Sequence, residues 1–148
     1  MIDLIKKTVP GFELEVLEED VLCILNPHKT EDIIICADEI FCVKENGEME
    51  YDFDDIMVSF GRAFCRFDDA EEALEYIRKW MEEELVCISF YGGGEWIVSY
   101  EAESTGFDVS RVLRLAHGID GGARGIDEVS YTVSSFRGTY TAHGNVKI

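Results

Sequence analysis

The stretch Ile33–Phe53, IIICADEIFCVKENGEMEYDF, contains the signals that decide how this chain folds. Two continuous apolar runs, at 33–36 and 40–43, are typical of strands in the centre of a sheet. Residues 48–53 alternate carboxylates with large apolar side chains, as a strand with one face in water does. Between these patterns lies Asn46-Gly47, which is the strongest hairpin signal in the chain.

The residues before this stretch continue the β pattern. Residues 12–16 alternate at period two, and residues 21–25 are mostly apolar, with the turn signal Asn26-Pro27 behind them. We therefore predict an antiparallel meander of about five strands, near 12–18, 21–26, 32–37, 39–45 and 48–53.

Residues 54–67 fit two interpretations, either a short helix followed by a strand or a second hairpin broken at Gly61. We favour a strand for the second half of this segment. The next segment has a clearer pattern, because Asp68-Asp69 can cap a helix and apolar side chains recur at helical spacing from Ala70 to Met81. A helix is predicted over 68–84.

The C-terminal half predicts a ββαββ unit. Its expected elements are strands 85–91 and 95–102, a helix near 108–117, a glycine-rich loop, and a closing hairpin of 128–135 with 139–147. No Pro/Ser-rich linker and no repeat separates the two halves, so we expect a single domain, 1–148, with one shared core. The expected fold class is α+β, with the meander and its helix followed by the ββαββ unit.

Charge is the most informative property of the composition. The 148 residues include 31 acidic and 13 basic side chains, a formal net charge of −18 at pH 7. Residues 1–90 hold 24 of the acids and 8 of the bases, whereas residues 91–148 hold 7 and 5. The chain therefore has an acidic front, 1–90, and a nearly neutral back, 91–148.

Several functional classes lack a signature in this sequence. There is no run of 18 apolar residues and no signal-peptide core, so we expect a cytoplasmic protein. The five cysteines form no CxxC pair and are flanked by apolar residues, which indicates reduced, buried thiols. The three histidines lack zinc-site spacing and no catalytic motif is present. We expect no enzyme activity, no metal and no cofactor.

One glycine-rich loop, His117–Gly125, resembles a binding site. Its glycines would let backbone N–H groups approach an anion, and Arg124 would supply a charge. The alternative functional hypothesis is therefore a module that binds or sequesters a small anion or nucleotide through His117, Gly121, Gly122 and Arg124. The loop follows a helix and fits neither the dinucleotide nor the P-loop context, so a plain helix end is the competing interpretation. A nucleotide that binds there must raise the melting temperature.

The acidic front suggests a different function. Side chains two residues apart on a strand share a face about 6.6 Å apart, so Glu48, Glu50 and Asp52 would form a ladder of carboxylates. Such a ladder offers a basic groove a substitute for a phosphate backbone. The competing interpretation is a solvated acidic surface that keeps the protein soluble. The clustering of the acids in one half, with few bases nearby, favours nucleic-acid mimicry.

We predict that a partner protein binds the acidic front. The expected contact residues are Glu13, Glu15, Glu31, Asp32, Asp38, Glu39, Glu48, Glu50, Tyr51, Asp52, Asp54, Asp55, Glu71, Glu72 and Glu75. In composition the chain resembles the acidic anti-CRISPR and anti-restriction proteins of phages and mobile elements, and the acidic immunity proteins of nuclease toxins. That resemblance implies an inhibitor of a nuclease-type effector, bound at the effector's basic nucleic-acid-binding surface, with no direct contact to nucleic acid or membrane. A small hydrolase that uses acidic residues and a divalent ion is a third hypothesis.

Overall fold

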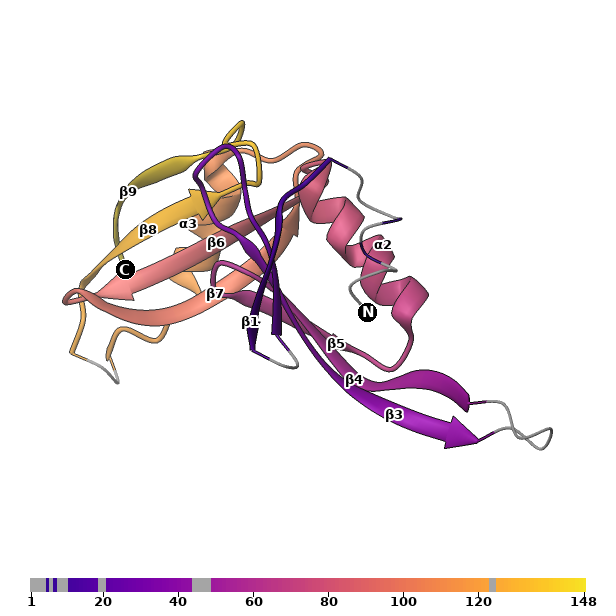
Figure 1. The fold of residues 1–148 in the computed structure, drawn as a ribbon. Coiled ribbons are helices and arrows are strands. Elements are labelled where there is room, and N and C mark those ends of the chain that lie inside the picture. The colour runs from indigo at the N-terminus through magenta and orange to yellow at the C-terminus, as the bar shows by residue number, and fades with distance from the viewer. Residues whose placement is uncertain (1–4, 6, 8–10, 19–20, 44–48, 123–124) are drawn as a thin grey trace.

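Two antiparallel sheets, each with a helix packed against it, form the part of the protein that the structure describes (Figure 1). The structure is a computed structural model, and it describes residues 5, 7, 11–18, 21–43, 49–122 and 125–148. For residues 38–43 and 49–54 the description covers the backbone. The α+β class predicted from the sequence is confirmed.

The N-terminal sheet is a meander in which every strand pairs with the next one along the chain. Its strands are β1 (Leu14–Glu18), β2 (Val21–Ile24), β3 (Ile33–Val43), β4 (Met49–Phe60) and β5 (Ala63–Phe67). The number of strands and the antiparallel order are as predicted, but the chain is divided differently. The strands expected at 32–37 and 39–45 form one long strand, β3, and the strand expected at 48–53 continues to Phe60 as β4.

A β-bulge explains why β3 continues through Asp38. The register shifts so that Ala37 pairs with Ile56 and Asp38 pairs with Asp54, which leaves Asp55 as an extra residue on β4. Asp55 has φ 57°, a left-handed conformation that aspartate tolerates better than most residues. The break expected at Asp38, between the predicted strands 32–37 and 39–45, therefore lies within one bulged strand.

Residues 54–67 form the second hairpin, and the helical interpretation of this segment is wrong. Phe60 pairs with Ala63, so the turn consists of Gly61 and Arg62. Gly61 has φ +57°, which glycine adopts without the steric cost of a Cβ. The helix predicted after this hairpin is confirmed as α2 (Ala70–Met81), where Asp69 accepts hydrogen bonds from the N–H groups of Glu71 and Glu72.

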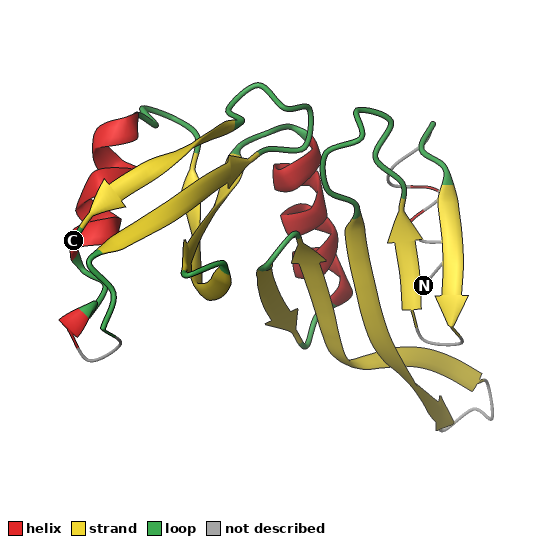
Figure 2. Ribbon diagram, turned by 90° about the vertical axis from the view of Figure 1, so that its left-hand side faces the viewer, coloured by secondary structure: helices red, strands yellow, loops and turns green. Residues whose placement is uncertain are grey.

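The C-terminal sheet confirms the predicted ββαββ order. Its elements are β6 (Leu85–Gly92), β7 (Glu95–Glu103), α3 (Val109–His117), β8 (Glu128–Ser134) and β9 (Ala142–Lys147). The strands lie in the order β7-β6-β8-β9, so the crossover through α3 places β8 beside β6. In Figure 2 this sheet and α3 lie on the left, and the N-terminal sheet lies on the right.

The buried side chains form two clusters. The first lies between the N-terminal sheet and α2, and the second lies between the C-terminal sheet and α3. The first cluster also contains Leu85, Cys87 and Phe136 from the C-terminal half. Phe136 is 1% exposed in the loop between β8 and β9, with its ring centroid 5.8 Å from that of Phe12 and 6.3 Å from that of Phe60. The loop thus inserts an aromatic ring from one half of the chain into the core of the other.

Two polar groups hold this loop in place. Glu83, 8% exposed, accepts hydrogen bonds through Oε1 from Ser135 Oγ at 2.6 Å and from the Arg137 N–H at 2.8 Å. On the other side, Asn26 Nδ2 donates to the carbonyl oxygen of Phe136 at 2.6 Å. Burial by itself would raise the pKa of Glu83, but the hydrogen bonds from Ser135, Thr139 and Arg137 outweigh it and lower that pKa below its ordinary value.

Glu83→Gln should lower the free energy of unfolding at pH 7 by about 1–2 kcal/mol, because the amide oxygen can accept the same bonds but without a charge. The folded-state pKa of Glu83 is lowered. Its extra stabilisation is therefore complete above the unfolded pKa, about 4.3, and is lost as the pH falls through the folded value. Urea unfolding of both proteins at pH 7 and pH 3 measures this. A difference between them that stayed the same at both pH values would contradict the role given to the charge.

Candidate protein-interaction surface

A two-stranded arm carries the largest group of the predicted contact residues. The far parts of β3 and β4, residues 38–43 and 49–54, pair with each other, whereas β2 pairs with 33–36 and β5 with 56–60. Figure 1 shows this arm extending past the end of α2 at the lower right. Its strands contain five acidic and no basic residues, namely Asp38, Glu39, Glu50, Asp52 and Asp54.

The register of the arm gives these acids no basic neighbour across the strands. Glu50 lies opposite Cys42, Asp52 opposite Ile40, and Asp38 opposite Asp54. Like charges directly opposite each other destabilise a strand pair. A two-stranded ribbon is at best marginally stable in water, so several charges of one sign on it are a stability cost. Tyr51 lies on the same arm, opposite Phe41, and Glu48 lies outside the described residues.

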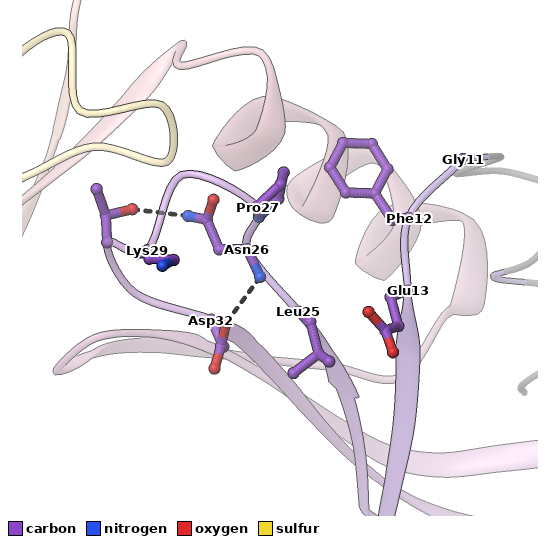
Figure 3. A pocket seen from close by; sticks show the side chains of 9 residues that line it. Gly11, Phe12, Glu13, Leu25, Asn26, Pro27, Lys29 and Asp32 are labelled. Carbon is purple, nitrogen blue, oxygen red and sulfur yellow. Dashed lines mark hydrogen bonds between the residues drawn. The ribbon is translucent and has the colours of Figure 1, made fainter.

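A second group of predicted residues lies at the β1 side of the N-terminal sheet. Leu14 packs against the first core cluster, so Glu13 and Glu15, which alternate with it, lie on the opposite face of the sheet. Both are exposed and neither has an ion pair with another described residue. Figure 3 shows the carboxylates of Glu13 and Asp32 on either side of Leu25, at the rim of a hollow of about 590 Å³.

The hollow itself is bounded by the turn between β2 and β3. The N–H of Asn26 donates to Asp32 Oδ1 at 2.7 Å, so one carboxylate oxygen of Asp32 is already used to fix this turn. Glu31 lies beside it and is exposed, and Lys29 is the basic residue that lines the hollow. Asp32 is thus partly structural, whereas Glu13, Glu15 and Glu31 remain available to a partner.

Burial and nearby carboxylates favour the protonated form of the Cys23 thiol. Cys23 lies opposite Glu15 in the β1–β2 register and is 4% exposed. Burial raises the pKa of its thiol, and the charges of Asp32 and Glu15 raise it further. The thiol therefore stays protonated at neutral pH, and only a thiolate is reactive.

The remaining predicted acids have structural roles or lie on another face. Glu71 and Glu72 are exposed in the first turn of α2, where carboxylates favour the helix dipole. Glu75 pairs with Arg78 at 2.6 Å. Since α2 covers the core face of the sheet, these three lie on the side of the molecule opposite Glu13 and Glu15. Asp55 forms an ion pair with Arg66 beside the bulge.

The glycine-rich loop has a packing explanation. A Cβ on Gly121 would overlap the carbonyl oxygen of Ile126 and would lie 2.6 Å from Ile148 Cδ1. The N–H groups of Gly125 and Ile126 donate to the carbonyls of Gly122 and Gly121, so they are used within the loop. His117 is exposed in the last turn of α3, and Arg124 lies outside the described residues. Anion binding by this loop stays a prediction.

Gly121→Ala should lower the free energy of unfolding by about 1–3 kcal/mol, because the backbone oxygen in its way cannot rotate aside. Gly122→Ala is the matched control, since its Cβ would have Asp120 Oδ1 at 3.6 Å as its nearest neighbour. Urea unfolding of the two variants measures the difference. Equal stability of both variants would remove the packing explanation and favour a role in ligand binding.

The sequence reasoning missed two contacts that join the halves of the molecule. The Arg62 guanidinium lies over the Trp96 ring, 5.4 Å from its centroid, and the Tyr76 hydroxyl donates to Glu101 Oε2. These contacts link α2 and the turn between β4 and β5 to β7. No local pattern signals them, because each partner lies more than twenty positions from the other.

The described residues contain no metal-binding cluster and no membrane-spanning helix. No group of three or more His, Cys, Asp or Glu side chains there is arranged to hold a metal ion. Neither α2 nor α3 has the length and apolar character that a membrane-crossing helix needs. No protein family, no curated protein and no solved structure matches this chain. Its fold and charge define an acidic α+β protein.

Proposed function

We propose that this protein is an acidic inhibitor that binds the basic nucleic-acid-binding surface of a nuclease-type effector, as anti-CRISPR, anti-restriction and toxin-immunity proteins do. The proposal takes the arm, residues 38–43 and 49–54, as the main contact. Glu13 and Glu15 at the β1 side, with Glu31 beside the turn between β4 and β5, are the second contact.

One observation carries the proposal, which is the acidic composition of the arm. Five acids and no base lie on its two strand segments, 38–43 and 49–54, which pair with each other. By contrast, some acids elsewhere in the front half form ion pairs, such as Glu75 and Glu82 with Arg78. A solubilising surface would not need to gather acids without bases on the least supported strand segments of the sheet. A cationic groove on a partner would compensate them and release the counterions they attract.

The dimensions of the arm also suit this function. A two-stranded β-ribbon is narrower than a DNA duplex, because it fits inside the major groove of DNA. A groove on a protein that is wide enough for nucleic acid is therefore wide enough for a ribbon that carries negative charge along its length.

Capture from host lysate at low salt tests the proposal. The immobilised protein should retain a basic nucleic-acid-binding protein, and added double-stranded DNA should release it. Retention should weaken strongly between 50 and 200 mM salt, as it does for nucleic acid itself. A retained partner that DNA does not displace would contradict mimicry. Neutral dextran of similar mass is the control for crowding.

A further inference from the structure

The outer edge of β1 forms an unpaired edge of the N-terminal sheet among the described strands. Among the described strands, β1 pairs with β2 and with no other, so its second edge is open. In Figure 2, β1 is the outermost strand on the right. Val16 and Leu17 on this strand are 53% and 48% exposed, which is unusual for adjacent large apolar residues.

The backbone groups that face outward can be identified from the register. The Leu25 N–H donates to the Glu13 carbonyl, so Glu13 and, two residues on, Glu15 direct their backbone groups toward β2. The intervening residues, Leu14 and Val16, direct their N–H and C=O groups away from the sheet. An open edge of this kind is a template for an added strand.

The side chains of β1 define which strand would fit. Glu13 and Glu15 lie on the solvent face, and Leu14 and Val16 alternate with them toward the other face. An added strand places its side chains about 4.5–5.5 Å from those of its neighbour, so basic residues would meet the glutamates and apolar residues would meet Val16.

A second copy of this chain is a poor occupant of the edge. Pairing two β1 strands would bring Glu13, Glu15 and Glu18 of both copies together, and none of them has a counter-charge among the described residues. Like charges opposite each other destabilise the pair. The glutamates thus reject a second acidic copy and select a basic strand.

We infer that the open edge of β1 binds an extended segment of the partner protein, in which basic and apolar residues alternate, as an added antiparallel or parallel strand. This inference rests on the proposed function, because it requires a basic partner. It adds a second contact of a different kind from the arm, with main-chain hydrogen bonds in place of charge alone.

A synthetic peptide of alternating Lys and Val residues is the probe, and a peptide of the same composition with all Lys before all Val is its control. With the alternating peptide at ten times its Kd, amide exchange at Leu14 and Val16 should slow about tenfold, as measured by NMR. The block peptide should leave both amides unprotected. Absence of binding, or binding without protection of these two amides, would overturn the inference.

The variants Val16→Pro and Val16→Thr test whether backbone hydrogen bonds at the edge of β1 are needed for binding, because neither substitution changes the charge. Proline removes the outward N–H and is tolerated on an edge strand, whereas threonine keeps the N–H and the branched shape. Val16→Pro should abolish peptide protection at Leu14, and Val16→Thr should retain it, with melting temperatures confirming that both fold. If the wild type self-associates and Val16→Pro does not, a second copy of the chain occupies the edge, and the inference is overturned. If the Val16→Pro variant still captures a basic partner that DNA displaces as efficiently as the wild type does, the β1 contact is rejected and the proposed function stands.

Discussion

Neutralising Glu39, Glu50 and Asp52 together, to Gln, Gln and Asn, is expected to slow association with the captured partner by about tenfold or more at low salt. The three residues lie on the paired strand segments of the arm, which contain no basic residue. Electrostatic steering acts on the association rate more than on dissociation, and salt screens it. The rates of variant and wild type should therefore converge as salt is raised, in stopped-flow or surface-binding measurements.

A control with the same change in net charge makes this result specific to the arm. Glu95, Glu103 and Glu128 are exposed in the C-terminal half, and replacing all three with Gln changes the net charge from −18 by the same three charges. This control should associate at nearly the wild-type rate. Equal slowing by both triple variants would mean that total charge, and not the arm, governs association.

The stability of the triple arm variant tests separately whether these acids serve the fold. The wild-type arm carries its charges at a cost, since Asp52 and Glu50 lie opposite Ile40 and Cys42 and not opposite a base. Removing repulsion should leave the free energy of unfolding unchanged or slightly higher. A clear loss of stability would indicate that these acids serve the fold, which would weaken their assignment to binding.

Phe136→Ala is expected to lower the free energy of unfolding by about 3–5 kcal/mol, which is the range for removing a buried aromatic ring from a core. Phe136 is 1% exposed and lies against Phe12 and Phe60 in the first cluster. For a chain of this length the melting temperature should fall by about 6–20 °C. Urea unfolding and differential scanning calorimetry measure the two quantities.

Phe64→Ala is the matched control for this prediction. Phe64 is 64% exposed on β5, so the same substitution removes little buried surface there. Its expected effect is within about 0.5 kcal/mol, as for most surface substitutions. If Phe136→Ala were equally mild, the loop between β8 and β9 would not anchor the two halves to each other.

The elements with strong local signals could be predicted from the sequence. The helix after Asp69 has a capping residue and an apolar face at helical spacing, and α2 begins and ends within a few residues of the predicted limits. The β3–β4 hairpin was predicted from its flanking runs, although its turn, including Asn46-Gly47, lies outside the described residues. The limits of β3 were not predictable, because polar residues separate its two apolar runs and only the bulge at Asp55 lets one strand continue through them.

The candidate site could be predicted only in part. Composition showed that the acids gather in residues 1–90, but not which of them share a surface. The structure places Glu71, Glu72 and Glu75 on the opposite side from Glu13 and Glu15, because α2 covers one face of the sheet and β1 exposes its glutamates on the other. Face assignment depends on which side the core lies, and that is decided by residues far apart in the chain.

The sequence by itself determined the α+β class, the order of strands and helices, and the unequal distribution of charge, because each depends on periodicity, capping and composition within short windows. Tertiary structure alone decided that Phe136 enters the core of the other half, that Glu83 holds its loop, and that the acids of 38–43 and 49–54 lie on a separate arm. These features arise from contacts between distant residues, and burial of apolar surface and satisfaction of buried polar groups select such contacts only when the whole chain is folded.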